Sequence, residues 1–113
     1  MNTKAIVKEY FGKHWTSRTS TYRYSSCETI ASKIATHETV IDVGCGNNEF
    51  KPHIKHLTGI DIVNPAADIC VDLDEYDPDQ LFDVAICLGV IQYGDENDIT
   101  RQIAKVGSIL KPS

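Results

Sequence analysis

The chain has 113 residues and a net charge of −5, and 42% of its residues are hydrophobic and 24% charged. This length supports one domain, and this composition excludes the disordered and fibrous classes of protein. The longest mostly apolar run, 84–91, is far too short to span a bilayer, and the N-terminus lacks a signal-peptide pattern, so the sequence predicts a cytoplasmic protein without a membrane anchor.

Two helices joined by an irregular arm are the first elements that we expect. A helix over 3–11, ended by Gly12, is predicted by apolar residues at helical spacing, namely Ile6, Val7, Tyr10 and Phe11. The segment 13–25 has no clear period and predicts an irregular arm. A capping-box pattern at Ser25 predicts a second helix, whose inward face comprises Cys27, Ile30, Ala31 and Ile34. We therefore assign 1–37 as an N-terminal helical arm.

Positive charge gathers in this arm. Residues 1–36 hold six of the eleven Lys and Arg, whereas residues 37–113 hold fourteen of the sixteen Asp and Glu. Two interpretations remain open. The basic arm meets an anionic partner such as nucleic acid, or its charges only solvate two short helices.

Strands alternate with helices in the remainder of the chain, which predicts an α/β domain with a parallel sheet and right-handed crossovers. We expect strands at 39–43, 57–62, 68–71 and 82–88, and helices at 47–55 and 95–110. The last helix has an apolar stripe of Ile99, Ile103, Val106 and Leu110. The fourth strand is almost wholly apolar, which is typical of a strand buried on both faces. Only 63–67 separate the second and third strands, so the third is expected to be very short or loosely paired at the sheet edge.

The cysteines and histidines show no spacing typical of a metal site. Four isolated cysteines (Cys27, Cys45, Cys70 and Cys87) form no C-x-x-C pair. Reduced, buried thiols are the favoured interpretation, and disulfide pairing is the alternative. The sequence thus predicts no metal.

A glycine-paired turn follows the first strand in the segment Asp42-Val43-Gly44-Cys45-Gly46. Such a turn brings backbone amides close to a ligand at the carboxyl edge of the sheet. Asp61, nineteen residues after Asp42, stands at the end of the next strand, where it can accept hydrogen bonds from a ribose. By themselves these features fit either a dinucleotide or an adenosyl ligand.

The charges near this turn favour the adenosyl ligand. Glu49 stands where a dinucleotide loop has its third glycine, and Asp42 stands at the entrance of the loop. Two carboxylates without a nearby Lys or Arg repel a pyrophosphate, which a dinucleotide site must hold. They suit a ligand that carries an ammonium and a sulfonium cation.

Several ordered motifs over 38–112 resemble those of class I S-adenosylmethionine-dependent methyltransferases. The similar segments are Asp42-x-Gly44-x-Gly46, Gly59-Ile-Asp61-Ile62, 68–73, 82–93 and Lys111-Pro112. The resemblance implies a Rossmann-like, doubly wound parallel sheet with strand order 3-2-1-4, as in the N-terminal two-thirds of the family's fold. It also implies that 38–113 form the S-adenosylmethionine-binding domain, and it extends to small methyltransferase-like proteins of bacteria and their phages.

The resemblance names the cofactor, S-adenosylmethionine, and its contacts. Those contacts are Asp42, Gly44 and Gly46 at the methionine portion, Asp61 at the ribose, Ile62 and Asp72 at the adenine, and Leu88 after the fourth strand. For Asp72, which lies in an acidic run, simple solvation is the alternative. Aromatic residues of the arm either close the site or cover the sheet, namely Trp15, Tyr22 and Tyr24. No catalytic residue is nominated, because positioning can supply much of the catalysis of methyl transfer.

Two functions stay open at this point. One is methyl transfer to an unidentified acceptor, and the other is a non-catalytic S-adenosylmethionine-binding or interaction module. A nicotinamide-dependent reductase is disfavoured by the charges of the loop. In the family three more strands follow the Lys-Pro turn, whereas this chain ends at Ser113. We therefore expect 82–88 to be an edge strand with unpaired amides, and the chain to self-associate through it.

Overall fold

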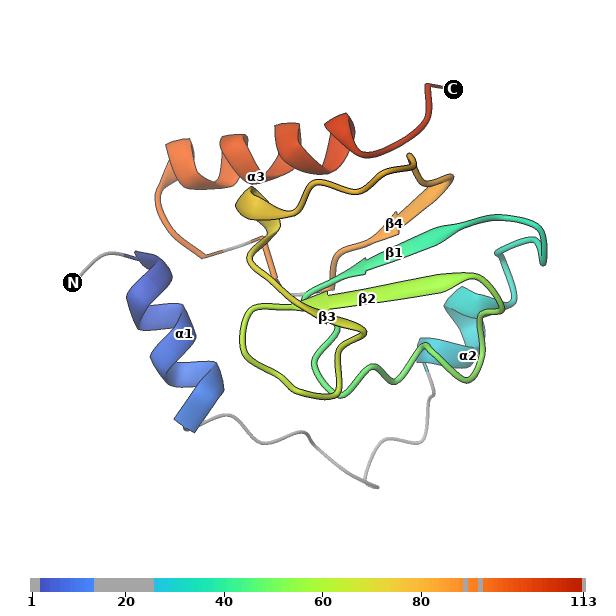
Figure 1. The fold of residues 1–113 in the computed structure, drawn as a ribbon, viewed down its shortest axis with the longest axis horizontal. Helices are drawn as coiled ribbons and strands as arrows, with labels where there is room; N and C mark the ends of the chain where they lie inside the picture. Colours follow the sequence, from blue (N-terminus) through green and yellow to red (C-terminus); the bar gives the residue numbers. More distant parts are fainter. Residues whose placement is uncertain (1–2, 14–25, 89, 92, 113) are drawn as a thin grey trace.

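A parallel sheet of four strands forms the centre of the computed structural model, which describes residues 3–13, 26–88, 90–91 and 93–112. The strands are β1 (Val40–Val43), β2 (Leu57–Asp61), β3 (Ile69–Cys70) and β4 (Val84–Ile86). The helices are α1 (Thr3–Lys13), α2 (Ser26–Ala31) and α3 (Glu96–Ser108), with the 3-10 helix η1 (Leu73–Glu75). The observed order β3-β2-β1-β4 confirms the predicted topology (Figure 1).

Two apolar cores cover the two faces of the sheet. Ile41 and Val43 of β1 pack with Ile109, which directly follows α3, on one face. Val40 packs on the opposite face with Phe50 and the predicted inward side of α2. In Figure 1, α3 and α2 accordingly lie on opposite sides of the sheet. The alternation of strand side chains thus produces a helix–sheet–helix sandwich.

Helix α3 begins at a complete capping box. The Asp95 side chain accepts from the Asp98 amide, and the Asp98 side chain accepts from the Asp95 amide. The predicted apolar stripe is only partly correct, because Ile103 is 55% exposed. The segment instead buries Ile109, which is 3% exposed.

The predicted helix over 47–55 is wrong, because the structure has a series of turns there. The amide of Asn48 donates to Cys45 O, and the amide of Lys51 donates to Asn48 O. Asn48 has a φ of 60°, in the left-handed region, which a right-handed helix does not accept. Pro52 removes a further amide donor.

The short link between β2 and β3 is held by Asp68. Its amide donates to Gly59 O at 2.9 Å, and its Oδ2 atom accepts from the Gly59 amide at 2.7 Å. Lys51 Nζ lies 3.1 Å from the same Oδ2 atom. The link therefore closes without a crossover helix, and β3 is a two-residue strand at the sheet edge, as the sequence predicts.

Strand β4 lies at the other edge of the described sheet, and Phe82, two residues before it, is already paired. The Phe82 amide donates to Ile109 O at 2.9 Å, and the Lys111 amide donates to Phe82 O at 2.8 Å. The expectation that all of 82–88 lacks a partner is therefore wrong at Phe82. Strand β4 is also only partly buried rather than buried on both faces. Self-association through this edge stays a prediction.

All four cysteines carry free thiols, but the predicted burial is correct only for Cys45, because Cys27 and Cys87 are half-buried and Cys70 is exposed. Burial, followed by the charge of Asp42, raises the pKa of Cys45 to about 12. Among the described residues, no group of three or more His, Cys, Asp or Glu is arranged to hold a metal ion. No helix in that part of the chain is long and apolar enough to cross a membrane.

Candidate functional site

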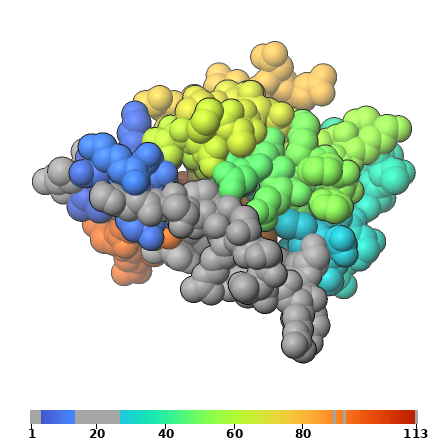
Figure 2. All heavy atoms as spheres, turned by 90° about the horizontal axis from the view of Figure 1, so that it is seen from below, coloured from blue at the N-terminus to red at the C-terminus, as the bar shows by residue number. Residues whose placement is uncertain are grey.

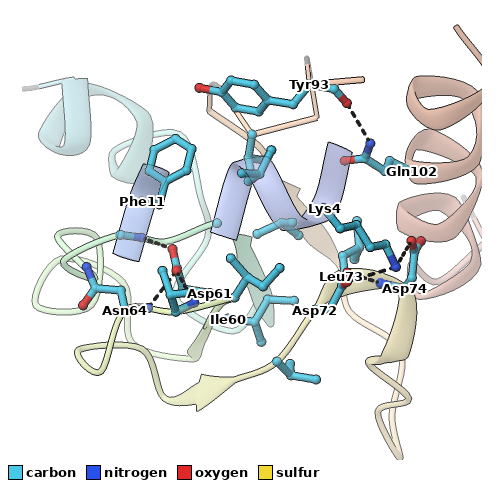
Figure 3. A pocket seen from close by; sticks show the side chains of 18 of the residues that line it. Lys4, Phe11, Ile60, Asp61, Asn64, Asp72, Leu73, Asp74, Tyr93 and Gln102 are labelled. Atoms are coloured by element: carbon cyan, nitrogen blue, oxygen red, sulfur yellow. Dashed lines mark hydrogen bonds and ion pairs between the residues drawn. The ribbon is translucent and has the colours of Figure 1, made fainter. Parts of the chain in front are cut away.

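A cavity of about 420 Å³ opens at the carboxyl ends of β1, β2 and β4, a size typical of small-molecule sites (Figure 3). The strand ends contribute Val43, Gly44, Gly46, Ile60, Asp61, Ile62, Leu88, Val90 and Tyr93. Helix α1 contributes Lys4, Val7 and Phe11, and α3 contributes Asp98, Arg101 and Gln102. The cavity therefore lies between the sheet edge and helix α1.

The turn after β1 depends on its two glycines. Gly44 and Gly46 have φ values of 67° and 56°, in the left-handed region that favours glycine. A Cβ atom at Gly44 would also overlap the side chain of Val90, in the loop after β4. The turn consequently exposes backbone to the cavity while it packs closely against the neighbouring loop.

Asp61 joins the ends of β1 and β2. Its Oδ2 atom accepts from the Gly46 amide at 3.0 Å, and its Oδ1 atom accepts from the amides of Val63 and Asn64 at 3.0 and 2.9 Å. A carboxylate has about four lone-pair positions. Three backbone bonds therefore leave room for one further donor, and Asp61 faces the cavity from which that donor would come (Figure 3).

Asp42 lies beneath the turn instead of lining the cavity. Its side chain is 3% exposed, and its Oδ2 atom has no hydrogen-bond partner. Burial, followed by the charge of Asp61, raises the pKa of Asp42 to about 7. A buried carboxyl group without a partner is energetically costly, and such groups cluster at functional sites.

A network of ion pairs closes the end of the cavity near η1. Asp72 Oδ1 caps η1 by accepting from the Asp74 amide at 3.0 Å, while Lys4 Nζ lies 3.0 Å from Asp72 Oδ2. The Asp74 carboxylate lies 2.9 Å from Lys4 Nζ and 3.1 Å from Arg101 Nε. Asp72 is thus built into a network and is not a merely solvated acid.

Helix α1 covers the cavity, which sequence reasoning did not predict. In the space-filling view α1 (blue) lies against the yellow-green segment that follows β2 (Figure 2). Val7 and Phe11 line the cavity, and the Phe11 ring contacts Tyr93 edge-to-face with centroids 5.7 Å apart. Ile6 and Tyr10, assigned to the same apolar face, are instead 53% and 50% exposed. The helix also continues through the predicted stop to Lys13.

The structure brings together most of the predicted contact residues. Six line the cavity: Gly44, Gly46, Asp61, Ile62, Asp72 and Leu88. Other predictions fall outside the described residues, namely those for Trp15, Tyr22 and Tyr24 and for two of the six basic residues of the arm, Arg18 and Arg23. Lys4 and Arg101 also line the cavity. No sequence pattern predicts this position, because an isolated lysine or arginine on a helix is usually exposed to solvent.

No family model and no curated protein sequence matches the chain. Several solved structures share its fold. Magnesium protoporphyrin IX methyltransferase from Synechocystis PCC 6803, with bound S-adenosylmethionine, has a TM-score of 0.77 at 16% identity and aligns over 98% of this chain and 73% of its own. The N-methyltransferase NodS from Bradyrhizobium japonicum, with S-adenosyl-L-homocysteine, has a TM-score of 0.69 at 18% identity, over 99% and 69%.

An amino pentose methyltransferase from Micromonospora echinaspora, with bound S-adenosylmethionine, has a TM-score of 0.64 at 17% identity. It aligns over 88% of this chain and 55% of its own length. The chain thus spans between 55% and 73% of the length of these three structures. At these identities the likeness concerns the fold.

Proposed function

We propose that this chain, which has the fold of class I methyltransferases, binds S-adenosylmethionine in the cavity and transfers its methyl group to an acceptor. The unpartnered Oδ2 atom of Asp42 is the observation that carries the proposal. Asp42 lies buried beneath the Gly44–Gly46 turn, and Asp61 is close enough for its charge to raise the Asp42 pKa. Two neighbouring carboxylates at a strand end favour a cationic ligand over an anionic one.

The residues present fit this cofactor. Gly44 and Gly46 would bring backbone to the methionine portion, and Asp42 would compensate its ammonium charge. The remaining acceptor position of Asp61 would take a ribose hydroxyl, and Ile62 and Asp72 would adjoin the adenine. The cavity volume of about 420 Å³ suits a ligand of this size.

The bound cofactor supplies an electrophilic methyl group on a sulfonium centre. The contribution of the chain is to hold the reacting groups in line and to exclude water, which can supply much of the catalysis. Val7, Phe11 and Tyr93 provide apolar walls between the sheet edge and α1. Within such walls, charge interactions are stronger than in water.

The ligand preference is directly testable. We expect S-adenosylmethionine and S-adenosylhomocysteine to bind at least tenfold more tightly than NAD, because the site presents carboxylates where a pyrophosphate needs cations. Isothermal titration calorimetry of the three compounds measures this preference. Equal or tighter binding of NAD would contradict the proposed ligand.

Binding is expected to strengthen about tenfold between pH 5.5 and pH 7. A cation in the cavity, separated from Asp42 by the Gly44–Gly46 turn, favours the ionised form of this carboxyl group. The complex then forms with release of a proton while Asp42 is protonated in the ligand-free chain. Affinity then rises with pH until the pH reaches the ligand-free pKa of about 7. The pH range of the experiment ends at 7 because the α-amino group of the ligand would itself lose its proton above this pH, since such groups titrate near pH 7.7–8.0. Calorimetry across this range should give a flat profile for Asp42→Asn, and a flat wild-type profile would contradict the role of Asp42.

Methyl transfer itself requires an acceptor. Incubation with radiolabelled S-adenosylmethionine and panels of small amines, small hydroxyl compounds, oligonucleotides and peptides should transfer label to one panel. Transfer of label to no panel, although the ligand binds, would favour the non-catalytic module.

A further inference from the structure

Lys4 connects helix α1 to the far end of the cavity. Its Nζ atom lies 3.0 Å from Asp72 Oδ2 and 2.9 Å from Asp74 Oδ2. Dashed lines mark both ion pairs in Figure 3. The two carboxylates are about one-fifth exposed, so this double ion pair is screened less than one on an open surface. Accordingly, the Lys4 pKa is raised and the Asp74 pKa is lowered by their hydrogen bond.

The two acids are held in place independently of Lys4. Asp72 caps η1 through the Asp74 amide, and Arg101 of α3 lies 3.1 Å from Asp74 Oδ2. Arg101 also pairs with Asp98 at 2.9 Å within α3. The acceptors for Lys4 therefore belong to the body of the domain and are preorganised before α1 docks.

Helix α1 is short, and its two ends contact different parts of the domain. It has 11 residues, a length at which an isolated helix is marginal in water. At its other end, Phe11 contacts Tyr93, and a Cβ atom on Gly12 would lie 3.9 Å from Val63. Two exposed apolar residues, Ile6 and Tyr10, face outward. Among the described residues, α1 is thus attached to the domain by a polar contact near its start and by apolar contacts near its end.

We propose that α1 is a lid over the cavity and that Lys4, through Asp72 and Asp74, is the latch that holds it closed. The identity of the enclosed ligand rests on the proposed function, whereas the latch does not. Lys4 is a positioning residue, because it acts by holding α1 in place. A ligand that reaches Asp72 lies under the latched end of α1, so its release requires the Lys4 ion pairs to open.

Hydrogen exchange of the ligand-free chain tests the latch without any ligand. In Lys4→Met, the amides of α1 should exchange about five- to tenfold faster, as expected for the loss of two partly buried ion pairs. Lys4→Arg keeps the cation and should retain the wild-type rates. Lys8→Met removes an exposed cation of the same helix and should also leave the rates unchanged.

Two results would overturn the proposal. One is an unchanged exchange rate of α1 in Lys4→Met. The other is an equal acceleration at Val43 and Ile60 of the sheet, which would mark Lys4 as a stabiliser of the whole fold. Raising NaCl from about 50 to 500 mM should accelerate exchange of α1 in the wild type and not in Lys4→Met, because salt screens the ion pairs.

The rate of ligand release tests the gating function. Dissociation of S-adenosylhomocysteine, followed by stopped flow, should be about five- to tenfold faster from Lys4→Met than from the wild type, Lys4→Arg or Lys8→Met. An unchanged rate would overturn gating. Failure of the wild type to bind S-adenosylhomocysteine would instead contradict the proposed function, and hydrogen exchange would still decide whether the latch exists.

Discussion

Replacing Asp61 by Ala is expected to weaken binding of S-adenosylmethionine by roughly ten- to a hundredfold. A hydrogen bond from a hydroxyl to a charged carboxylate contributes about 1.5–3 kcal/mol, which corresponds to one to two decades in the dissociation constant. Asp61 also orders the turn through Gly46 and the following loop through Val63 and Asn64, so both effects act in the same direction. Calorimetry with S-adenosylhomocysteine and S-adenosylmethionine measures the change.

Asp68→Ala is the matched control for this experiment. Asp68 likewise accepts a backbone amide at β2, from Gly59, but it does not line the cavity. Its replacement should lower the free energy of unfolding while changing the dissociation constant by less than about twofold. Equal losses of affinity in both variants would mean that loop stability, and not a contact from Asp61, governs binding.

The Asp42 carboxyl group is expected to lower the free energy of unfolding by on the order of 2–3 kcal/mol between pH 5 and pH 8. Replacing Asp42 by Asn is expected to remove this loss. The folded-state pKa of Asp42 is about 7, against a reference value of 3.8. Since the folded state disfavours the ionised form, this group lowers the free energy of unfolding as pH rises from about 4 to about 7. Each unit of pKa difference corresponds to about 1.4 kcal/mol, and most of the loss falls between the two pH values chosen.

Urea denaturation at pH 5 and pH 8 measures this effect in the ligand-free chain. The comparison uses the difference between the two pH values, so any cost of the Asn amide itself cancels. The same difference in wild type and Asp42→Asn would contradict the raised pKa of Asp42. Asp42 would thus lower the stability of the ligand-free chain, and the bound ligand would compensate this cost. Such a cost is typical of residues in functional sites.

Local signals in the sequence are sufficient for the parallel sheet and for the centre of the site, whereas the order of the strands followed from the resemblance to class I methyltransferases. Short apolar runs, separated by helical patterns, indicate a parallel sheet, and its carboxyl ends necessarily meet at one edge. Gly44 and Gly46 are predictable because a left-handed turn needs glycine, and Asp61 because it ends the next strand. These features depend on neighbours close in sequence or on the register of adjacent strands.

Only the tertiary structure determines that α1 covers the cavity and which of the weakly predicted helices form. Lys4 contacts Asp72 and Asp74, which lie far from it in the sequence, and no local pattern distinguishes such a lysine from a solvated one. The turns at 47–55 replace a helix because Asn48 adopts a left-handed conformation, with its side chain packed close to Gly59. Local conformations often differ little in intrinsic energy, so contacts between distant segments determine which one forms. Sequence patterns therefore predict the sheet, whereas the position of α1 over the cavity depends on tertiary contacts.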